Sequence, residues 1–116
     1  MKLSKQRQER GPRGAHSGAP LQGSARFRAI ISGTVQMVGF RAFAESRAGM
    51  RGIGGYVRNL PTSEVEVVAE GDRSLLAEFL AELRRGPSGA HVRNVMVSWE
   101  QPRGEFGDFT VRYGVW

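Results

Sequence analysis

The chain alternates between segments with the hydrophobic period of a strand and segments with the spacing of a helix. The order of these segments limits its fold more than any other feature. Residues 26–35 ("RFRAIISGTV") place Phe27, Ala29 and Ile31 on one side of an extended chain and mainly polar residues on the other. Residues 40–51 ("FRAFAESRAGMR") instead repeat apolar residues at helical spacing. A strand followed by a helix is therefore predicted.

The next segments predict a hairpin and a second helix. Residues 53–60 and 64–71 are two strand-like runs joined by a tight connection. Asp72 then stands where a helix N-cap is favoured, because its side chain can accept a hydrogen bond from a free amide of the first turn. Residues 75–83 form one apolar helical face, and Gly86 with the following proline ends the pattern.

Two further strand patterns, over residues 92–100 and 108–113, complete the order β-α-β-β-α-β with a small extra strand. We expect an α+β protein with the ferredoxin-like split βαβ sandwich. Since each helix has a single apolar face, the two helices should cover one face of an antiparallel sheet.

The basic charge is concentrated at the N-terminal end. Residues 1–24 carry five lysines and arginines against one glutamate, so they account for +4 of the formal charge of +6. The segment has too few large apolar residues to offset the entropy of ordering it. We predict a disordered basic tail over residues 1–24 and a folded domain over residues 25–116. Nucleic acid is expected to bind only non-specifically, through this tail.

Composition excludes several classes of protein. There is no cysteine, so the chain can form neither a disulfide scaffold nor a thiolate metal site. One histidine, His16, lies in the tail and the other, His91, begins a late strand, so no metal site is expected. No apolar run approaches the roughly 18 residues of a membrane span. The charged N-terminus does not resemble a secretory signal. A cytoplasmic monomer is the expected form.

The segment "GTVQMVGFR", from Gly33 to Arg41, joins the first strand to the first helix. A glycine-containing turn at this position directs several backbone N–H groups to one point, and the helix dipole adds positive potential there. Such a point binds phosphate, and an arginine in the first helical turn can pair with two phosphate oxygens. The segment indicates a phosphate-binding loop; the competing interpretation is a tight connection with a solvated Arg41.

The same residues resemble a known family. "GTVQMVGFR" is similar to the GxVQGVxFR signature of the acylphosphatase family. Residues 54–71, "GGYVRNLPTSEVEVVAEG", are similar to the family's second signature, in which an asparagine follows an aromatic residue and Asp-Gly precedes the next strand. The resemblance covers about residues 26–113, which is nearly the whole predicted domain.

The resemblance implies a hydrolase that cleaves the carboxyl–phosphate bond of acyl phosphates, releasing a carboxylate and inorganic phosphate. It implies no metal, no other cofactor and no covalent intermediate. In the family, the arginine of the first signature binds phosphate with the amides of the turn, and the asparagine of the second orients the attacking water. These catalytic roles fall to Arg41 and Asn59. The phosphate would be bound by the backbone of Gln36, Met37, Val38, Gly39 and Phe40, together with Arg41.

The chain departs from the family pattern at three places. Met37 replaces a glycine, and a left-handed backbone there would cost a residue with a Cβ roughly 1 kcal/mol. Thr62 and Ser63 replace Asp-Gly, which predicts a looser or distorted turn between the two central strands, with an effect on local stability rather than on chemistry. Arg51 stands at a usually apolar position, and its stem is expected to pack while its charge reaches water.

Charged side chains on the hairpin are expected to lie in solvent. Arg58 should point to the opposite face from Asn59. Glu64 and Glu66 share one strand face, where a solvated pair is favoured over an acid–base dyad.

Two alternatives to the enzyme stay open at this point. One is an acylphosphatase-like anion-binding module whose catalysis is impaired by Met37. The other is nucleic-acid binding through the basic tail. The absence of the aromatic-rich signature of RNA-binding ferredoxin-like domains weighs against the second.

Overall fold

The computed structural model of the protein describes residues 23–114. Its elements follow the predicted order. They are β3 (Ser24–Thr34), α1 (Phe40–Gly49), β4 (Gly54–Asn59), β5 (Val65–Asp72), α2 (Arg73–Arg85), β6 (His91–Glu100) and β7 (Phe109–Arg112). Most of the predicted tail, residues 1–22, lies outside the described part of the chain, as do residues 115–116.

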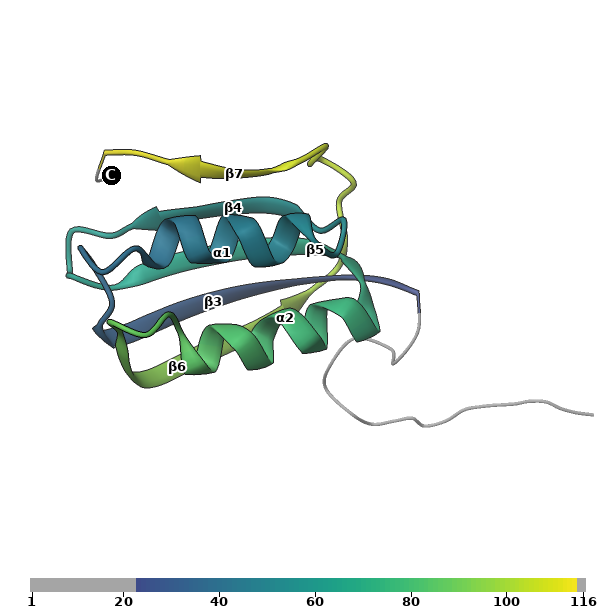
Figure 1. Cartoon of the computed structure of the whole chain (residues 1–116). Coiled ribbons are helices and arrows are strands. Elements are labelled where there is room, and N and C mark those ends of the chain that lie inside the picture. The colour runs from purple at the N-terminus through teal and green to yellow at the C-terminus, as the bar shows by residue number, and fades with distance from the viewer. Residues whose placement is uncertain (1–22, 115–116) are drawn as a thin grey trace, which may run out of the picture.

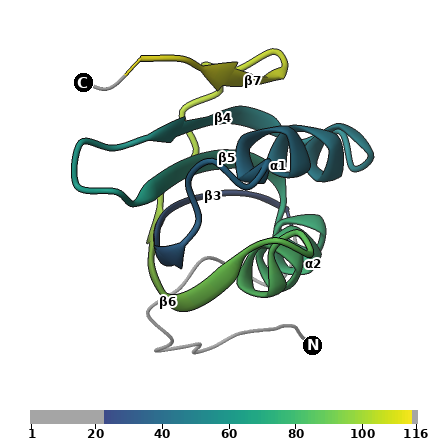
Figure 2. The same cartoon turned by 60° about the vertical axis from the view of Figure 1, so that its left-hand side comes forward.

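The strands form one five-stranded sheet in the order β6-β3-β5-β4-β7, and both helices lie on the same face of it (Figures 1 and 2). The predicted ferredoxin-like α+β arrangement is confirmed. The sheet is mixed rather than wholly antiparallel, because β7 pairs with β4 in parallel while the other three pairings are antiparallel.

Strand direction brings three strand ends to one edge of the sheet. Both β3 and β4 are antiparallel to β5, so they run in the same direction, and β7 runs parallel to β4. The carboxyl ends of β3, β4 and β7 therefore lie at the same edge (Figure 1). The loop from β3 to α1, the last residue of β4 and the residues after β7 all meet there.

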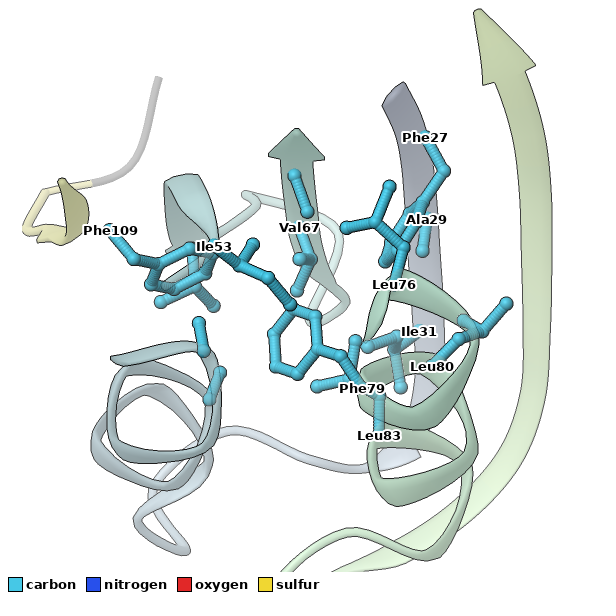
Figure 3. Packing of buried hydrophobic residues seen from close by; sticks show 14 of the residues in the cluster. Phe27, Ala29, Ile31, Ile53, Val67, Leu76, Phe79, Leu80, Leu83 and Phe109 are labelled. Carbon is cyan, nitrogen blue, oxygen red and sulfur yellow. The ribbon is translucent and has the colours of Figure 1, made fainter. Parts of the chain in front are cut away.

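The core lies between the sheet and the helices (Figure 3). The alternation predicted for β3 is confirmed, with Phe27, Ala29 and Ile31 fully buried. Phe79 of α2 bridges two distant strands, because its ring centroid lies 6.2 Å from that of Phe27 and 5.6 Å from that of Phe109 on β7. Each large apolar side chain buried in this way contributes roughly 1.5–3 kcal/mol of transfer free energy.

The second helix begins and ends as the sequence predicts. Asp72 is its N-cap and accepts a hydrogen bond from the N–H of Leu75 at 3.4 Å, and Gly86 is its C-cap, with a φ of 70°. Leucines and Phe79 bury one face of this helix. Within residues 23–114, no helix is long and apolar enough to cross a membrane.

The segment from β6 to β7, residues 101–108, connects the two outermost strands of the sheet. It crosses the face of the sheet that the helices leave open. Phe106 of this crossing segment lies against Tyr56, with ring centroids 6.0 Å apart. It also covers Gly54, where an added Cβ would come within 2.9 Å of the Cβ of Phe106.

Arg26 is buried beneath the crossing segment. The alternation of β3 places Arg26 opposite the core, yet it is only 6% exposed. Its guanidinium donates to Glu70 and Glu105, both at 2.7 Å, and to Glu100 at 3.0 Å. Burial opposes the ionisation of Glu70, but Arg26 and two N–H groups of the crossing segment outweigh it, so the pKa of Glu70 is lowered.

The prediction of solvated charges on the hairpin is wrong for Glu66 and Arg58. Glu66 is 2% exposed and accepts hydrogen bonds from the Nε atoms of Arg28, at 2.6 Å, and Arg58. The side chain of Arg58 is 22% exposed. Burial raises the pKa of Glu66, but the two arginines more than offset this and leave it below the usual value. The spacing of Glu64 and Glu66 does not reveal these partners, because Arg28 comes from a different strand.

Arg51 links the two helices instead of reaching open water. Its Nη2 lies 3.1 Å from Glu82 Oε2 and its Nε 3.3 Å from Glu78 Oε1, both on α2. Its Nη1 also donates to the backbone oxygen of Arg47 at 3.0 Å. The expectation for the charge of Arg51 is corrected accordingly, because α2 places carboxylates where the sequence predicts solvent.

The turn between β4 and β5 is closed by hydrogen bonds, so of the looser or distorted turn predicted from Thr62 and Ser63 it shows the distortion and not the looseness. The N–H of Leu60 donates to the oxygen of Glu64 at 2.8 Å, and the N–H of Ser63 donates to the oxygen of Leu60 at 3.2 Å. Ser63 takes a left-handed φ of 74°, as glycine usually does in three-residue hairpin loops. The departure from Asp-Gly is accommodated by backbone strain at Ser63, while the loop keeps its length and closure.

Replacing Ser63 with glycine should therefore stabilise the protein. We expect Ser63→Gly to raise the free energy of unfolding by roughly 0.5–1 kcal/mol, since the left-handed penalty exceeds the added entropy of the unfolded chain. Ser63→Ala is the matched control and should bring no gain, because alanine keeps the Cβ. Urea unfolding measures both variants. A glycine variant no more stable than the alanine variant would show that this φ carries no strain.

Candidate active site

A pocket of about 180 Å³ lies at the edge of the sheet where β3, β4 and β7 end. Its walls come from the loop after β3, the first turn of α1, the last residue of β4 and the residue after β7. The residues that line it are Val35, Met37, Gly39, Phe40, Arg41, Ala42, Asn59 and Tyr113.

The loop between β3 and α1 contains two residues with a left-handed backbone. Met37 has a φ of 64° and Gly39 a φ of 79°, with Val38 between them outside the positive-φ region. Gly39 is left-handed and is followed directly by the right-handed residues of α1, and a step of this kind turns successive N–H groups towards one concavity. Met37 takes the left-handed conformation although it has a Cβ, and its side chain is 99% exposed. The loop thus keeps this shape at an energetic cost.

The first turn of α1 adds positive potential to the same pocket. Gly39 is the N-cap, so no side chain caps the helix, and the first turn contains no acidic residue. The first amides of a helix have no intrahelical acceptor, and the helix dipole places partial positive charge there. An anion at this point would meet donors that are not already neutralised.

Arg41 lies in this first turn and is half-buried. Its guanidinium carbon lies 4.9 Å from the ring centroid of Tyr113, within the range of a cation–π contact. In residues 23–114, no carboxylate forms a salt bridge with Arg41, in contrast to Arg26 and Arg51. An aromatic ring orients the guanidinium while its charge stays available to a ligand.

Asn59 ends β4 and lines the same pocket as Arg41. The pocket-lining residues that the structure describes include two ionisable side chains, Arg41 and Tyr113, and neither a carboxylate nor an imidazole. A carboxamide can accept from and donate to a water molecule, but it does not act as a base near neutral pH.

The structure brings most of the predicted site residues together, but not all. Arg41, Asn59, Met37, Gly39 and Phe40 line the pocket. The side chains of Gln36 and Val38 do not. Val38 packs against the hydrophobic core, and Gln36 turns towards the β4–β5 hairpin.

Tyr113 is a pocket residue that sequence reasoning missed. The strand pattern of residues 108–113 places it at the end of the final strand but says nothing about the neighbour of that strand. Only the parallel pairing of β7 with β4 brings Tyr113 to the edge that holds Arg41.

Glycine at position 37 should stabilise the loop without changing its shape. We expect Met37→Gly to raise the free energy of unfolding by up to about 1 kcal/mol, because it removes the left-handed penalty. Its kcat/KM for an acyl phosphate should change by less than about threefold, since the backbone already has the required conformation. The measurements are urea unfolding and steady-state kinetics, with Met37→Ala as the control that keeps the Cβ. A tenfold gain in rate would show that Met37 distorts the loop.

Comparisons with known proteins agree with this geometry. A family model described as acylphosphatase matches residues 27–111. The chain is 46% identical over 87 residues to an acylphosphatase of Dehalococcoides mccartyi, covering 74% of this chain and 96% of the relative. Among solved structures, the acylphosphatase of Bacillus subtilis superposes with a TM-score of 0.74 at 30% identity, covering 77% of this chain and 99% of that one. The acylphosphatase of Coxiella burnetii gives a TM-score of 0.73 at 32% identity, with 77% and 93% covered.

Fold and pocket together define a small α+β domain with a pocket between its first strand and first helix. The chain belongs to the acylphosphatase family, the hydrolases of acyl phosphates. The predictions of family, fold and enzyme class are thereby confirmed.

Proposed function

We propose that this protein hydrolyses acyl phosphates by direct attack of water on a phosphate held by Arg41 and the amides of the β3–α1 loop. The observation that carries the proposal is the convergence of Arg41, Asn59 and the left-handed loop on one pocket. The guanidinium and the loop amides stabilise charge on the phosphate oxygens, and the Asn59 carboxamide aims the water.

Few catalytic groups are needed for this reaction. The attacking water forms a bond to phosphorus, the bond from phosphorus to the carboxyl oxygen breaks, and the carboxylate leaves with its electron pair. A carboxylate is a good leaving group, so catalysis reduces to positioning and charge stabilisation. With no carboxylate or imidazole among the pocket-lining residues described, the proton of the water passes to a phosphate oxygen of the substrate.

Hydrolysis of benzoyl phosphate tests the proposal. Wild-type protein should accelerate the release of benzoate and inorganic phosphate in stoichiometric amounts, and the Arg41 and Asn59 variants described in the Discussion should not. Deletion of residues 1–22 should leave the rate nearly unchanged. A wild-type rate equal to spontaneous hydrolysis, together with tight binding of inorganic phosphate, would favour the anion-binding module instead.

The proposal also covers the location, the oligomeric state and the ligands of the protein. We expect a cytoplasmic monomer whose ligands are a small acyl phosphate and inorganic phosphate. RNA binding that requires residues 1–22 and persists in Arg41→Ala would favour the nucleic-acid alternative over a role for the pocket.

A further inference from the structure

Gln36 connects the anion-binding loop to the hairpin that follows Asn59. Its Nε2 donates to the backbone oxygen of Leu60 at 3.0 Å and to that of Glu64 at 2.8 Å. A carboxamide nitrogen has two protons, so this group is fully used by the two carbonyls. The side chain is half-buried and does not line the pocket.

The two carbonyls are the ones that close the hairpin. The oxygen of Glu64 also accepts from the N–H of Leu60 at 2.8 Å, and the oxygen of Leu60 accepts from the N–H of Ser63 at 3.2 Å. Gln36 therefore binds the two carbonyls at the base of the hairpin loop, which begins directly after Asn59. This loop contains the strained residue Ser63. This contact spans the sheet from the end of β3 to the end of β4, although β5 lies between those strands.

We propose that the Gln36 side chain is a positioning residue that sets the place of Asn59 relative to the phosphate-binding loop. The inference rests on the proposed function, because it assigns Gln36 to the alignment of water with phosphate. The loop that would hold the phosphate and the strand end that would aim the water belong to different segments. Reacting groups must be held within about 0.5 Å of the productive geometry. The two hydrogen bonds of Gln36 link these segments directly and so restrict their relative movement.

Loss of these two hydrogen bonds should affect the alignment of Asn59 with the phosphate-binding loop more than it affects folding. Both carbonyls keep a backbone donor when the Gln36 amide is removed, so neither becomes an unsatisfied buried acceptor. Gln36→Met keeps the length and apolar stem of the side chain but removes both donors. Gln36→Glu keeps the shape and places carboxylate oxygens against two carbonyl oxygens, so the hairpin should move away from the loop.

Steady-state kinetics on benzoyl phosphate test the inference. We expect Gln36→Glu to lower kcat by about 10- to 100-fold, and Gln36→Met by less, because a displacement of the order of 1 Å costs about 100-fold. The inhibition constant for inorganic phosphate should change by less than about threefold, since the loop and Arg41 are retained. Gln101→Glu is the matched control: it makes the same chemical change on the exposed crossing segment and should leave kcat unchanged.

A double-mutant cycle separates positioning from general destabilisation. In an Asn59→Ala background, Gln36→Glu should lower kcat by less than about threefold, because the group that it positions is already absent. Multiplicative losses in the double variant, or a loss confined to phosphate affinity, would overturn the inference.

Nuclear magnetic resonance provides a readout that does not depend on turnover. Gln36→Met should shift the backbone amide signals of Asn59 and of residues 60–64, and it should remove a side-chain amide signal protected from exchange. If wild-type protein does not hydrolyse benzoyl phosphate, the proposed function fails, while these shifts still decide whether Gln36 positions Asn59. Unchanged hairpin signals would overturn the inference even in an active enzyme.

Discussion

Arg41→Ala should lower kcat/KM for benzoyl phosphate by at least about a thousandfold. One preorganised donor to a transition-state oxygen is worth roughly a hundred- to a thousandfold, and a guanidinium provides two such donors with a full charge. Arg41 stands at the N-terminus of α1, where no side chain caps the helix, and no carboxylate among residues 23–114 forms a salt bridge with it, so that part of the chain does not offset its charge. Substrate binding and turnover should both weaken, because the ligand is charged in the ground state as well as in the transition state.

Two further variants make this result specific. Arg41→Lys keeps the charge but cannot pair with two oxygens at once, so we expect about a hundredfold loss. Arg47→Ala removes the same charge from the same helix, where the side chain lies over Phe43, 5.0 Å from its ring centroid, and it should change kcat/KM by less than about threefold. An Arg41→Ala enzyme that retains more than a tenth of wild-type activity would disprove the assigned role.

Asn59→Ala should lower kcat by about a hundred- to a thousandfold while phosphate affinity changes little. The carboxamide is proposed to hold the attacking water, which contributes only when the new bond forms, so its removal should appear in kcat. Asn59 ends β4, and its exchange for alanine removes no buried ion pair. The variant should therefore stay folded, as circular dichroism would verify. An equal rise in the inhibition constant for phosphate would assign Asn59 to binding instead.

The pH dependence of kcat tests whether a protein side chain acts as the base in this mechanism. Among the described residues, the pocket is lined by no carboxylate and no imidazole, so we expect no step in kcat near neutral pH from a protein base. The ionisation of the substrate phosphate should account for any dependence. A sharp step that disappears on mutation of one glutamate or of His91 would contradict proton transfer to the substrate.

Local sequence predicted the strands and helices well, and it predicted the loop and the arginine that line the pocket. The β3 alternation, the Asp72 cap and the apolar face of α2 all depend on residues within a few positions of one another. The strand–loop–helix junction is equally local, because the loop glycine and the helix N-terminus stand beside Arg41 in the chain. The Met37 and Ser63 strain also follows from substitutions that are visible in the sequence.

The remaining features depend on contacts between distant segments. Arg26 and Glu100 are 74 positions apart, and their burial depends on the route of residues 101–108 across the open face of the sheet. Periodicity reports which side of a strand a residue occupies but does not report whether another segment covers that side. The expectation of solvated charges for Glu66 and Arg58 is wrong for a related reason, since a partner lies on another strand.

By itself the sequence determined the order of strands and helices, the side of each that enters the core, and the residue types available at the β3–α1 junction. Hydrophobic period, capping and turn chemistry act over a few residues, so they can be read along the chain. Only the tertiary structure decided that Tyr113 lies in the pocket of Arg41 and that Gln36 reaches the hairpin, and it placed Asn59, which the family resemblance had implied, in the same pocket. The physical reason is that strand pairing and direction determine which strand ends meet, and these pairings involve residues far apart in the chain.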